Sequence, residues 1–308
     1  MSLRRRAAVL VGAIAIDLVL GDAPDRWHPV AWFGNGANAA IARLPRGGFR
    51  RDLRSGLVLA AGGGVGALVA GRFAARAARM LPGPIAFAAE AFALKQAVSA
   101  RGLAAHAIAV AWPLEHGDLP AAREAVRMMV SRDVASLGEG AIASAAVEST
   151  AENASDSVIA PAAWYLTGGL PMAWAYRAVN TLDAMVGYRK HGIFGSPAAR
   201  ADDALNFVPA RLTAAVVAIV SADPEAAWRG AREGAGRTPS PNSGWPMAAT
   251  AHALGVRLEK PGVHILNGDG REPGAHDIRG AIWLLGRGLA LVVGGAALFA
   301  AWPRGAKA

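Results

Sequence analysis

The chain has no cysteine among its 308 residues. Disulfides, zinc–thiolate sites, iron–sulfur clusters and cysteine nucleophiles are therefore excluded. Aromatic residues make up only 6% of the chain, too few for a platform that stacks nucleic-acid bases. The chain also lacks a G-x-x-x-x-G-K-[S/T] phosphate loop, an H-E-x-x-H zinc motif and a G-x-S-x-G nucleophile motif. A bound nucleotide would have to be held by a less common arrangement.

Charged residues are scarce at 18%, whereas apolar residues reach 53% and the mean hydropathy is +0.28. Such an excess of apolar residues is typical of a membrane protein. The net charge of +9 comes almost entirely from arginine, which membrane proteins place at helix ends and in cytoplasmic loops. We therefore expect no nucleic-acid partner. Recognition of an anionic substrate is an alternative explanation for the arginines.

The N-terminal segment "MSLRRRAAVLVGAIAIDLVLGDAP" has the basic start and apolar stretch of a signal peptide. Asp17 interrupts the apolar part and no A-x-A-like cleavage site follows, so we expect the segment to be retained. The apolar stretch 7–20 suits a short, tilted or protein-buried helix. The basic start predicts a cytoplasmic N-terminus, but the arginines of 43–54 would then lie outside if this segment crossed fully.

Two segments are the best candidates for membrane-spanning helices. Residues 55–71 are 17 uncharged residues whose glycines would allow close helix contacts. Arg72, Arg76 and Arg79 follow at helical spacing and predict a basic stripe on one helix face. Residues 280–303 form the second candidate, interrupted only by Arg287.

Other apolar segments are shorter or broken. Residues 80–112 carry Glu90 and Lys95 and predict one or two helices that face the protein interior. Prolines and glycines within 157–176 predict a broken helix, and 212–222 is apolar but short.

Alternating strand patterns are nearly absent, whereas 113–156 and 223–279 are polar. The sequence predicts an all-α, polytopic integral membrane protein with broken helices and four or five spans. We expect a single membrane-embedded domain, 1–308, within which 113–156 and 223–279 are exposed to water.

Residues 180–213 concentrate polar side chains in this otherwise oily chain. Asn180 and Asp183 are three residues apart, and Asp202 or Asp203 with Asn206 would present a carboxylate and an amide on one helix face. Carboxylate and amide oxygens, with water, are the ligands that Mg²⁺ takes when it carries nucleotide phosphates. The predicted metal ligands are Asp183, Asp202 and Asp203. The structural alternative is a solvated loop in which Asp202 caps the following helix.

Three further polar clusters lie elsewhere. Glu152 and Asp156 are four residues apart, and a cation between them would relieve their repulsion; the alternative is a pair favoured by a helix dipole. His28 follows the first apolar segment, where a structural role and proton transfer are both open. The run "SPNSGWP" at 240–246 predicts a tight turn whose backbone N–H groups could meet an anion.

Five blocks of the sequence, taken in order, resemble the adenosylcobinamide-phosphate synthases of cobalamin biosynthesis, the CobD/CbiB family. The blocks run from about residue 17 to 258: "GDAPDRWHPVAWFG", "ENASDSVIAP", "YRAVNTLDAMVGYR", "ARADDALNFVPARLTA" and "SPNSGWPMAATAHALGVRL". Three departures stand out: Ser157 replaces a family glycine, Pro24 is displaced from its usual place, and the run "RKHGI" adds Lys190 and His191.

The resemblance implies an ATP- and Mg²⁺-dependent ligase that joins adenosylcobyric acid to aminopropanol phosphate or a related threonine-derived phosphate through an amide bond. It implies a multi-pass protein of the cytoplasmic (inner) membrane with its active site facing the cytoplasm; oligomeric state and association with other enzymes of the pathway stay open. The catalytic candidates are Glu152, Asp156, Asp183, Asp202, Asp203 and, as the weakest, His28. The substrate-binding candidates are Asn153, Asn180, Arg177, Tyr188, Arg189, Asn206, Arg211 and Asn242.

A non-catalytic corrinoid or anion carrier, or a scaffold for neighbouring enzymes, is the alternative from another class. Asp17, Glu90 and Lys95 lie within apolar segments and fit a transporter equally well.

Overall fold

The structure is a computed structural model and describes residues 1–188 and 191–302. Within these residues the chain forms thirteen α-helices, a short 3-10 helix, one π-helical turn and a small hairpin. The prediction of an all-α, polytopic membrane protein is confirmed. The helical segments long and apolar enough to cross a membrane are Phe49–Arg79, Gly83–Glu115, Gly192–Val220 and Ala275–Ala301.

The chain divides into two compact units. The first contains residues 1–99, 160–205 and those from Val292 onward; the second contains 100–159 and 206–291. The sequence predicted a single domain, 1–308. The segments 113–156 and 223–279, predicted to be exposed to water, both belong to the second unit, and their exposure stays a prediction.

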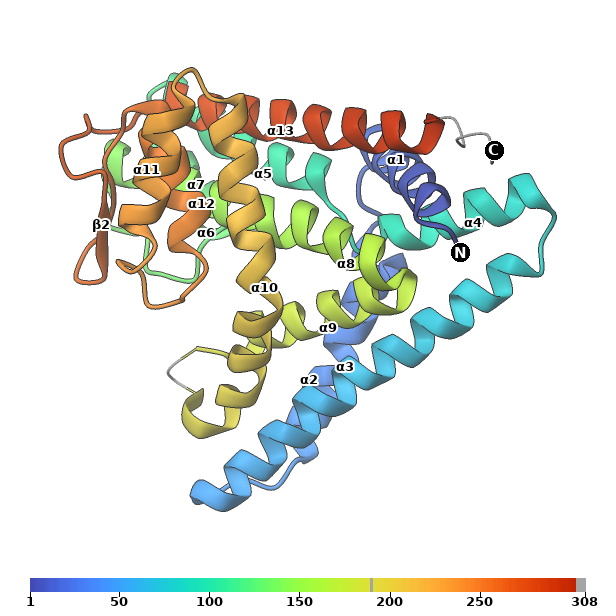
Figure 1. Cartoon of the computed structure of the whole chain (residues 1–308). Coiled ribbons are helices and arrows are strands. Elements are labelled where there is room, and N and C mark those ends of the chain that lie inside the picture. The colour runs from blue at the N-terminus through green and yellow to red at the C-terminus, as the bar shows by residue number, and fades with distance from the viewer. Residues whose placement is uncertain (189–190, 303–308) are drawn as a thin grey trace. The chain divides into compact units, whose positions relative to one another are not determined.

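The first unit is built around a long helix, α3, which packs along α9 (Figure 1). The shorter α1 packs against α4 and α8, and α2 packs against α3 and α9. The elements of this unit are α1 (Leu3–Leu20), the 3-10 helix η1 (Asp25–Trp27), α2 (Pro29–Arg43), α3 (Phe49–Arg79), α4 (Gly83–Lys95), α8 (Ala160–Gly168), α9 (Leu170–Val186), the first part of α10 (Gly192–Val220) and the end of α13 (Ala275–Ala301).

Glycines of α3 allow its backbone to approach neighbouring helices closely. A Cβ atom at Gly56 would lie 2.2 Å from the backbone oxygen of Phe194, and one at Gly71 would lie 2.8 Å from the Cα of Pro171. Both obstacles are backbone atoms, which cannot move aside as a side chain can. The predicted close helix contact of segment 55–71 is thus present in the structure.

The predicted break in segment 157–176 is confirmed, and it has two parts. A π-helical turn, η2 (Ser155–Ile159), interrupts the helix that begins as α7 (Glu139–Ala154) and continues as α8. Pro161 follows this turn and has no N–H with which to continue an α-helical ladder. The helix then ends at Gly168. The next residue, Gly169, has a φ of 71° that is readily adopted only by glycine, and α9 begins directly after it.

The structure of residues 192–220 differs from the prediction. Residues 212–222 are not a short separate segment, because a single helix of 29 residues, α10, extends from Gly192 to Val220. Asp202 lies inside this helix, so the alternative in which it caps a helix start is wrong. The change from polar to apolar residues near 212 suggested a boundary, but tertiary packing overrides local propensity here.

The second unit packs around α7, most of whose residues are buried. Its hairpin pairs Leu258 with Leu266, and both leucines join the core of this unit. Strands of three residues show no alternation in the sequence, so the hairpin was not predicted. The remaining elements are α5 (Ala100–Glu115), α6 (Leu119–Arg127), α11 (Pro224–Gly234), α12 (Gly244–Leu254), β1 (Leu258–Lys260) and β2 (His264–Leu266).

Candidate functional site

A small cavity in the first unit lies beside the "HPV" sequence block. It has a volume of about 170 Å³ and is bordered by residues from α2, α3, α9 and the turn after α4. Its lining residues are Pro29, Val30, Phe33, Ala67, Ala70, Gln96, Ala97, Trp174, Arg177, Ala178 and Thr181. Arg177 is the charged residue of this lining, and it can offer two parallel N–H groups to a carboxylate or phosphate.

Arg177 is connected to two predicted site residues by side-chain hydrogen bonds. Its Nη1 lies 3.5 Å from Oδ1 of Asn180, whose Nδ2 donates to Oδ1 of Asp202 over 3.1 Å. Asn180 belongs to α9 and Asp202 to α10, so this bond joins two separate sequence blocks. The predicted meeting of an amide and a carboxylate occurs here, and all three side chains are partly exposed.

Asp183 lies one turn further along α9, and its side chain lies against Gly187 at the end of that helix. A Cβ atom on Gly187 would lie only 1.8 Å from Oδ1 of Asp183. The N–H of Gly187 donates to the backbone oxygen of Asp183 over 2.7 Å. Glycine at this position of the "GY" block therefore leaves the space that the Asp183 carboxylate occupies.

His28 belongs to a partly buried polar cluster and directly precedes Pro29 of the cavity lining. Its Nδ1 accepts a hydrogen bond from the N–H of Val30 over 3.2 Å, so His28 caps the start of α2. Its Nε2 lies 3.8 Å from Oδ1 of Asp22. These contacts hold the "HPV" block in place and give His28 a structural role.

Lys95 lies at the centre of this cluster. Its ammonium group donates to Asp22 Oδ1 over 2.6 Å and lies 3.6 Å from Asp17, while Ser99 donates to the other Asp22 oxygen. Burial alone would raise the pKa of Asp22, but hydrogen bonds from His28, Lys95 and Ser99 and the charge of Lys95 hold that pKa well below its usual range. Asp22 was missed as a site residue because its partner Lys95 is 73 positions away.

A buried ion pair lies one helical turn before the "ENASD" block on α7 of the second unit. Glu148 accepts from His264 over 3.1 Å and lies 3.6 Å from Arg132. Asn153 is partly exposed and donates to the backbone oxygen of Ser149 over 2.9 Å.

The two predicted carboxylates of this block lie close to its irregular helix. Glu152 is exposed near the end of α7, and Asp156 is partly buried in the π-helical turn. Such turns often mark functional sites, because they change which side chains share a helix face.

The other predicted residues of the second unit lie on α10 and before α12. Arg211 Nη1 donates to Oδ1 of the buried Asn242 over 3.2 Å, and its guanidinium stacks 4.8 Å from the Trp245 ring centroid. The structure thus brings the "PARLT" and "SPNSGWP" blocks together. Asn206 is buried.

The remaining predicted residues belong to the first unit or lie outside the described part. Asp203 is partly buried beside Asp202 on α10, and Tyr188 is 43% exposed. Arg189 and Lys190 lie outside the described residues.

A divalent metal ion fits these residues only if it is bound together with substrate phosphates. Within residues 1–188 and 191–302 no three acidic or histidine side chains are grouped closely enough to form a metal cage. Mg²⁺, however, usually keeps several waters and binds through one or two carboxylates plus substrate phosphates. The Asn180–Asp202 pair suits an ion that arrives with a nucleotide rather than one held by the protein alone. The predicted ligands Asp183, Asp202 and Asp203 stay a prediction.

Comparison with known proteins gives a consistent result over most of the chain. A family model described as CobD/Cbib protein matches residues 10–285. The chain is 40% identical over 310 residues to the cobalamin biosynthesis protein CobD of Rhodobacter capsulatus, covering 94% of this chain and 96% of that protein.

Two further relatives match most of the chain. The chain is 40% identical over 301 residues to the cobalamin biosynthesis protein CobD of Mycobacterium tuberculosis, covering 91% of each chain. It is 39% identical over 267 residues to a probable cobalamin biosynthesis protein CobD of Methanothermobacter thermautotrophicus, covering 84% of this chain and 86% of that one. No solved structure matches the chain.

Proposed function

Because the chain belongs to the CobD/Cbib family, we propose that it is an adenosylcobinamide-phosphate synthase of cobalamin biosynthesis. The enzyme would form an amide between a propionate carboxylate of adenosylcobyric acid and the amine of aminopropanol phosphate or a related threonine-derived phosphate, and would consume ATP. The observation that carries the proposal is the hydrogen bond between Asn180 and Asp202, which joins two of the sequence blocks that resemble this family.

The chemistry requires activation, because a carboxylate does not condense with an amine in water. In the proposed first step a carboxylate oxygen attacks the γ-phosphorus of ATP, which forms an acyl phosphate and releases ADP. The amine then attacks the acyl carbon, the C–O bond to phosphate breaks, inorganic phosphate leaves and the amine loses a proton to a base. The intermediate must be shielded from water, and its partners must be held in the reacting geometry.

Several of the described side chains would supply anion contacts and an oriented carboxylate for this reaction. Arg177 borders a cavity that is otherwise largely apolar, and there it would bind a propionate or phosphate oxygen. Asn180 orients the Asp202 carboxylate, and Asp183 lies one turn further along α9. In the second unit, Arg211 and Asn242 would contribute a further anion contact.

Mg²⁺, when bound with ATP, would neutralise charge on the transferring phosphoryl group. Asp183, Asp202 and Asp203 are the proposed ligands. Glu152 and Asp156 are the proposed carboxylates for a second metal contact or for proton removal from the amine. Tyr188, Asn153, Asn206 and Arg189 are proposed substrate contacts.

The chain is a multi-pass membrane protein, with four helical segments that fit a spanning length and composition. We place it in the cytoplasmic membrane with the site facing the cytoplasm, where ATP is available. The basic N-terminal residues 4–6 support this orientation.

A corrinoid carrier is the second candidate, and the buried Lys95 with Asp17 and Asp22 favours it, because ionisable groups within apolar segments often mark transport pathways. In the structure Lys95 is nevertheless fully engaged by these carboxylates, which suits a fixed structural role.

The test is a condensation assay with purified protein in detergent. Adenosylcobyric acid, aminopropanol phosphate, Mg²⁺ and ATP should yield the amide product, detected by mass, together with one ADP per product. Omission of any one component should abolish the product. Tight corrinoid binding with no product under any of these conditions would reject the ligase and favour the carrier.

A further inference from the structure

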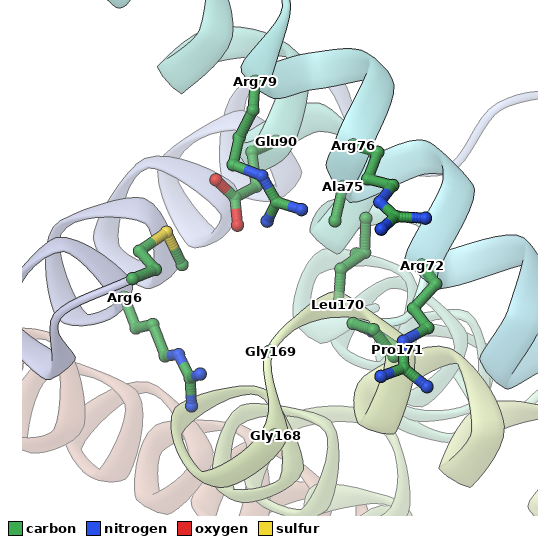
Figure 2. Close-up of a pocket in the computed structure, with 11 residues that line it drawn as sticks. Arg6, Arg72, Ala75, Arg76, Arg79, Glu90, Gly168, Gly169, Leu170 and Pro171 are labelled. Atoms are coloured by element: carbon green, nitrogen blue, oxygen red, sulfur yellow. The ribbon is translucent and has the colours of Figure 1, made fainter.

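A second cavity in the first unit is lined by arginine side chains and by none of the predicted site residues. Its volume is about 280 Å³, and it is bordered by the starts of α1 and α9 and by the end of α3 (Figure 2). The lining residues are Met1, Arg6, Arg72, Ala75, Arg76, Arg79, Glu90, Gly168, Gly169, Leu170 and Pro171. It shares no lining residue with the cavity beside the "HPV" block. Along α9, Arg177 lies about 10 Å and Asp183 about 20 Å from Leu170 at 1.5 Å per residue.

The arginines of the predicted stripe on α3 form one side of this cavity. Arg72, Arg76 and Arg79 share one helix face, and none of them forms an ion pair within the described part of the chain. Four arginines and one glutamate line the cavity, which leaves an excess of three positive charges. Guanidinium groups that lack carboxylate partners are the usual receptors for phosphate oxygens.

Arg6 contributes from the opposite side and is held in place by the protein. Its Nη1 donates to the backbone oxygens of Leu166 and Thr167 over 2.9 and 2.7 Å, at the end of α8. Its Nε is buried and has no hydrogen-bond partner. Figure 2 shows Arg6 on the opposite side of the opening from Arg72, with its side chain directed toward the end of α8.

The start of α9 adds partial positive charge to the same cavity. The residue before the helix is Gly169, which has no side chain to cap the first turn. Helix starts carry about half a positive charge. Pro171 has no N–H and Met172 donates to the backbone oxygen of Gly169 over 3.1 Å, so this helix start contributes charge rather than a set of free N–H groups.

Glu90 adds a carboxylate, which accepts hydrogen bonds, to the arginine-lined cavity. Its side chain is only 3% exposed, its Oε1 accepts from the Tyr165 hydroxyl over 2.9 Å, and its Oε2 has no hydrogen-bond partner. That Oε2 forms an ion pair with Arg5 over 3.5 Å, a distance longer than an ordinary hydrogen bond. Because this ion pair leaves Oε2 without a hydrogen bond, a hydroxyl or ammonium group of a ligand would supply one at the edge of the cavity.

We propose that this cavity binds a phosphate ester that also carries a hydroxyl or ammonium group, with the phosphate against the arginines and the donor against Glu90. Phospholipid headgroups and free amino-alcohol phosphates both present this chemistry. Apolar side chains beside the arginine stripe are strongly exposed, with Phe73 at 66% and Met80 at 87%, and the stripe ends a candidate membrane span. Acyl chains would cover these side chains, so the surroundings favour the phospholipid.

The experiment measures ligand retention and thermal stabilisation of delipidated protein in detergent. Phosphatidylglycerol, phosphatidylethanolamine, phosphatidylcholine, free aminopropanol phosphate and inorganic phosphate are each added, with binding followed by native mass spectrometry and by Tm. The test variants are Arg72→Gln with Arg76→Gln, and Glu90→Gln. The matched control is Arg50→Gln with Arg51→Gln, two exposed arginines at the other end of α3.

The arginine variant should weaken ligand binding at least tenfold, whereas the control pair should change it less than twofold. Arg72 and Arg76 are exposed, so their replacement should leave folding intact; Arg76→Lys, which keeps the charge, should retain intermediate binding. Glu90→Gln should reduce the preference for headgroups with a donor over phosphatidylcholine.

The ligands in this experiment distinguish a phospholipid headgroup from a free phosphate ester. Retention of phosphatidylglycerol or phosphatidylethanolamine that depends on the arginines identifies a lipid site, and arginine-dependent binding of aminopropanol phosphate without lipid identifies a site for the free ester. Equal binding by the pocket and control variants, or binding of phosphatidylcholine as tight as that of phosphatidylglycerol, would overturn the proposal.

Discussion

At the scale of single residues, the carboxylate of Asp202 is the best test of the proposed site. Asp202→Asn keeps the volume of the side chain but removes the charge that would face a magnesium-bound phosphate. We expect product formation to fall at least a hundredfold, the size typical for loss of one electrostatic contact in a transition state. The measurement is the rate of the condensation assay together with Tm.

The control for this prediction is Glu225→Gln, because Glu225 is an exposed carboxylate in the first turn of α11. It should leave rate and Tm unchanged. Full activity of Asp202→Asn would remove Asp202 from the site, and a large fall in Tm would show that its role is structural.

Lys95 should be essential for folding, because it compensates the charges of two carboxylates. Its side chain is 2% exposed and Asp17 is fully buried. Lys95→Met would leave Asp17 buried without its cation, a change that costs about 3–5 kcal/mol for such pairs. Equilibrium unfolding in detergent should show this loss, whereas Lys260→Met in the β1 strand should have little effect. A Lys95→Met protein of unchanged stability would mean that Asp17 is neutral.

The depressed pKa of Asp22 should make the stability of the protein depend on pH. Because its folded-state pKa is depressed, the stability it contributes is present above its unfolded pKa of about 3.9 and is lost as the pH falls below that value. The Tm of the natural chain should therefore fall more steeply between pH 5 and pH 3, roughly the range around that pKa, than the Tm of Asp22→Asn. Parallel curves for the two proteins would contradict the predicted linkage.

The site residues divide into those that spacing could predict and those that it could not. Asn180 and Asp202 were predicted from the density of amides and carboxylates in one segment, and the structure joins them directly. The pairing of Asp22 with Lys95 was not predicted, since it joins residues 73 positions apart and depends on how α1 packs against α4.

At the scale of elements, the glycines of α3 provide a prediction with internal controls. Gly56→Ala and Gly71→Ala each place a Cβ within 3 Å of a neighbouring backbone, which should destabilise the protein by about 1–3 kcal/mol. Gly62→Ala and Gly66→Ala meet no atom within 4 Å and should be neutral or stabilising by about 0.5–1 kcal/mol. The Tm values of the four variants check this, and four equal values would mean that α3 does not pack as described.

Breaks between helices were predicted from the sequence more reliably than the continuity of long helices. Gly169 and the prolines of 157–176 predicted the interruption, because the backbone physics of these residues is local. The continuous α10 was not predicted, since the change from polar to apolar residues near 212 resembles a boundary and only packing with other segments keeps the helix intact. The π-helical turn before Pro161 likewise has no local signal other than that proline.

At the scale of the whole molecule, the sequence blocks of the family are distributed over two units. Arg177, Asn180, Asp183 and Asp202 belong to the first unit, whereas Glu152 and Arg211 belong to the second. Hydropathy predicted two of the candidate spans, 55–71 and 280–303, but not the span Gly192–Val220. The division into units follows from contacts between distant residues and has no compositional boundary in the chain. The convergence of all these residues on one nucleotide stays a prediction.

The absence of cysteine makes the membrane topology directly testable, because any introduced cysteine is the sole thiol. Ala121 and Gly236 are exposed and lie in the two segments predicted to be on the water side, whereas Val65 is 59% exposed in the middle of the α3 span. A membrane-impermeant maleimide should label Ala121→Cys and Gly236→Cys in inside-out vesicles but not in intact cells. Val65→Cys should stay unlabelled until detergent is added, because lipid covers it.

Each outcome of this labelling experiment has a definite meaning for the proposed function. Labelling of Ala121→Cys and Gly236→Cys from the cytoplasmic side would place the second unit, with Glu152 and Arg211, where ATP is available. Labelling in intact cells would place these residues on the opposite face and would contradict a cytoplasmic ligase. Substitution at exposed positions of this kind changes stability by only about 0.5 kcal/mol, so the variants report topology rather than folding.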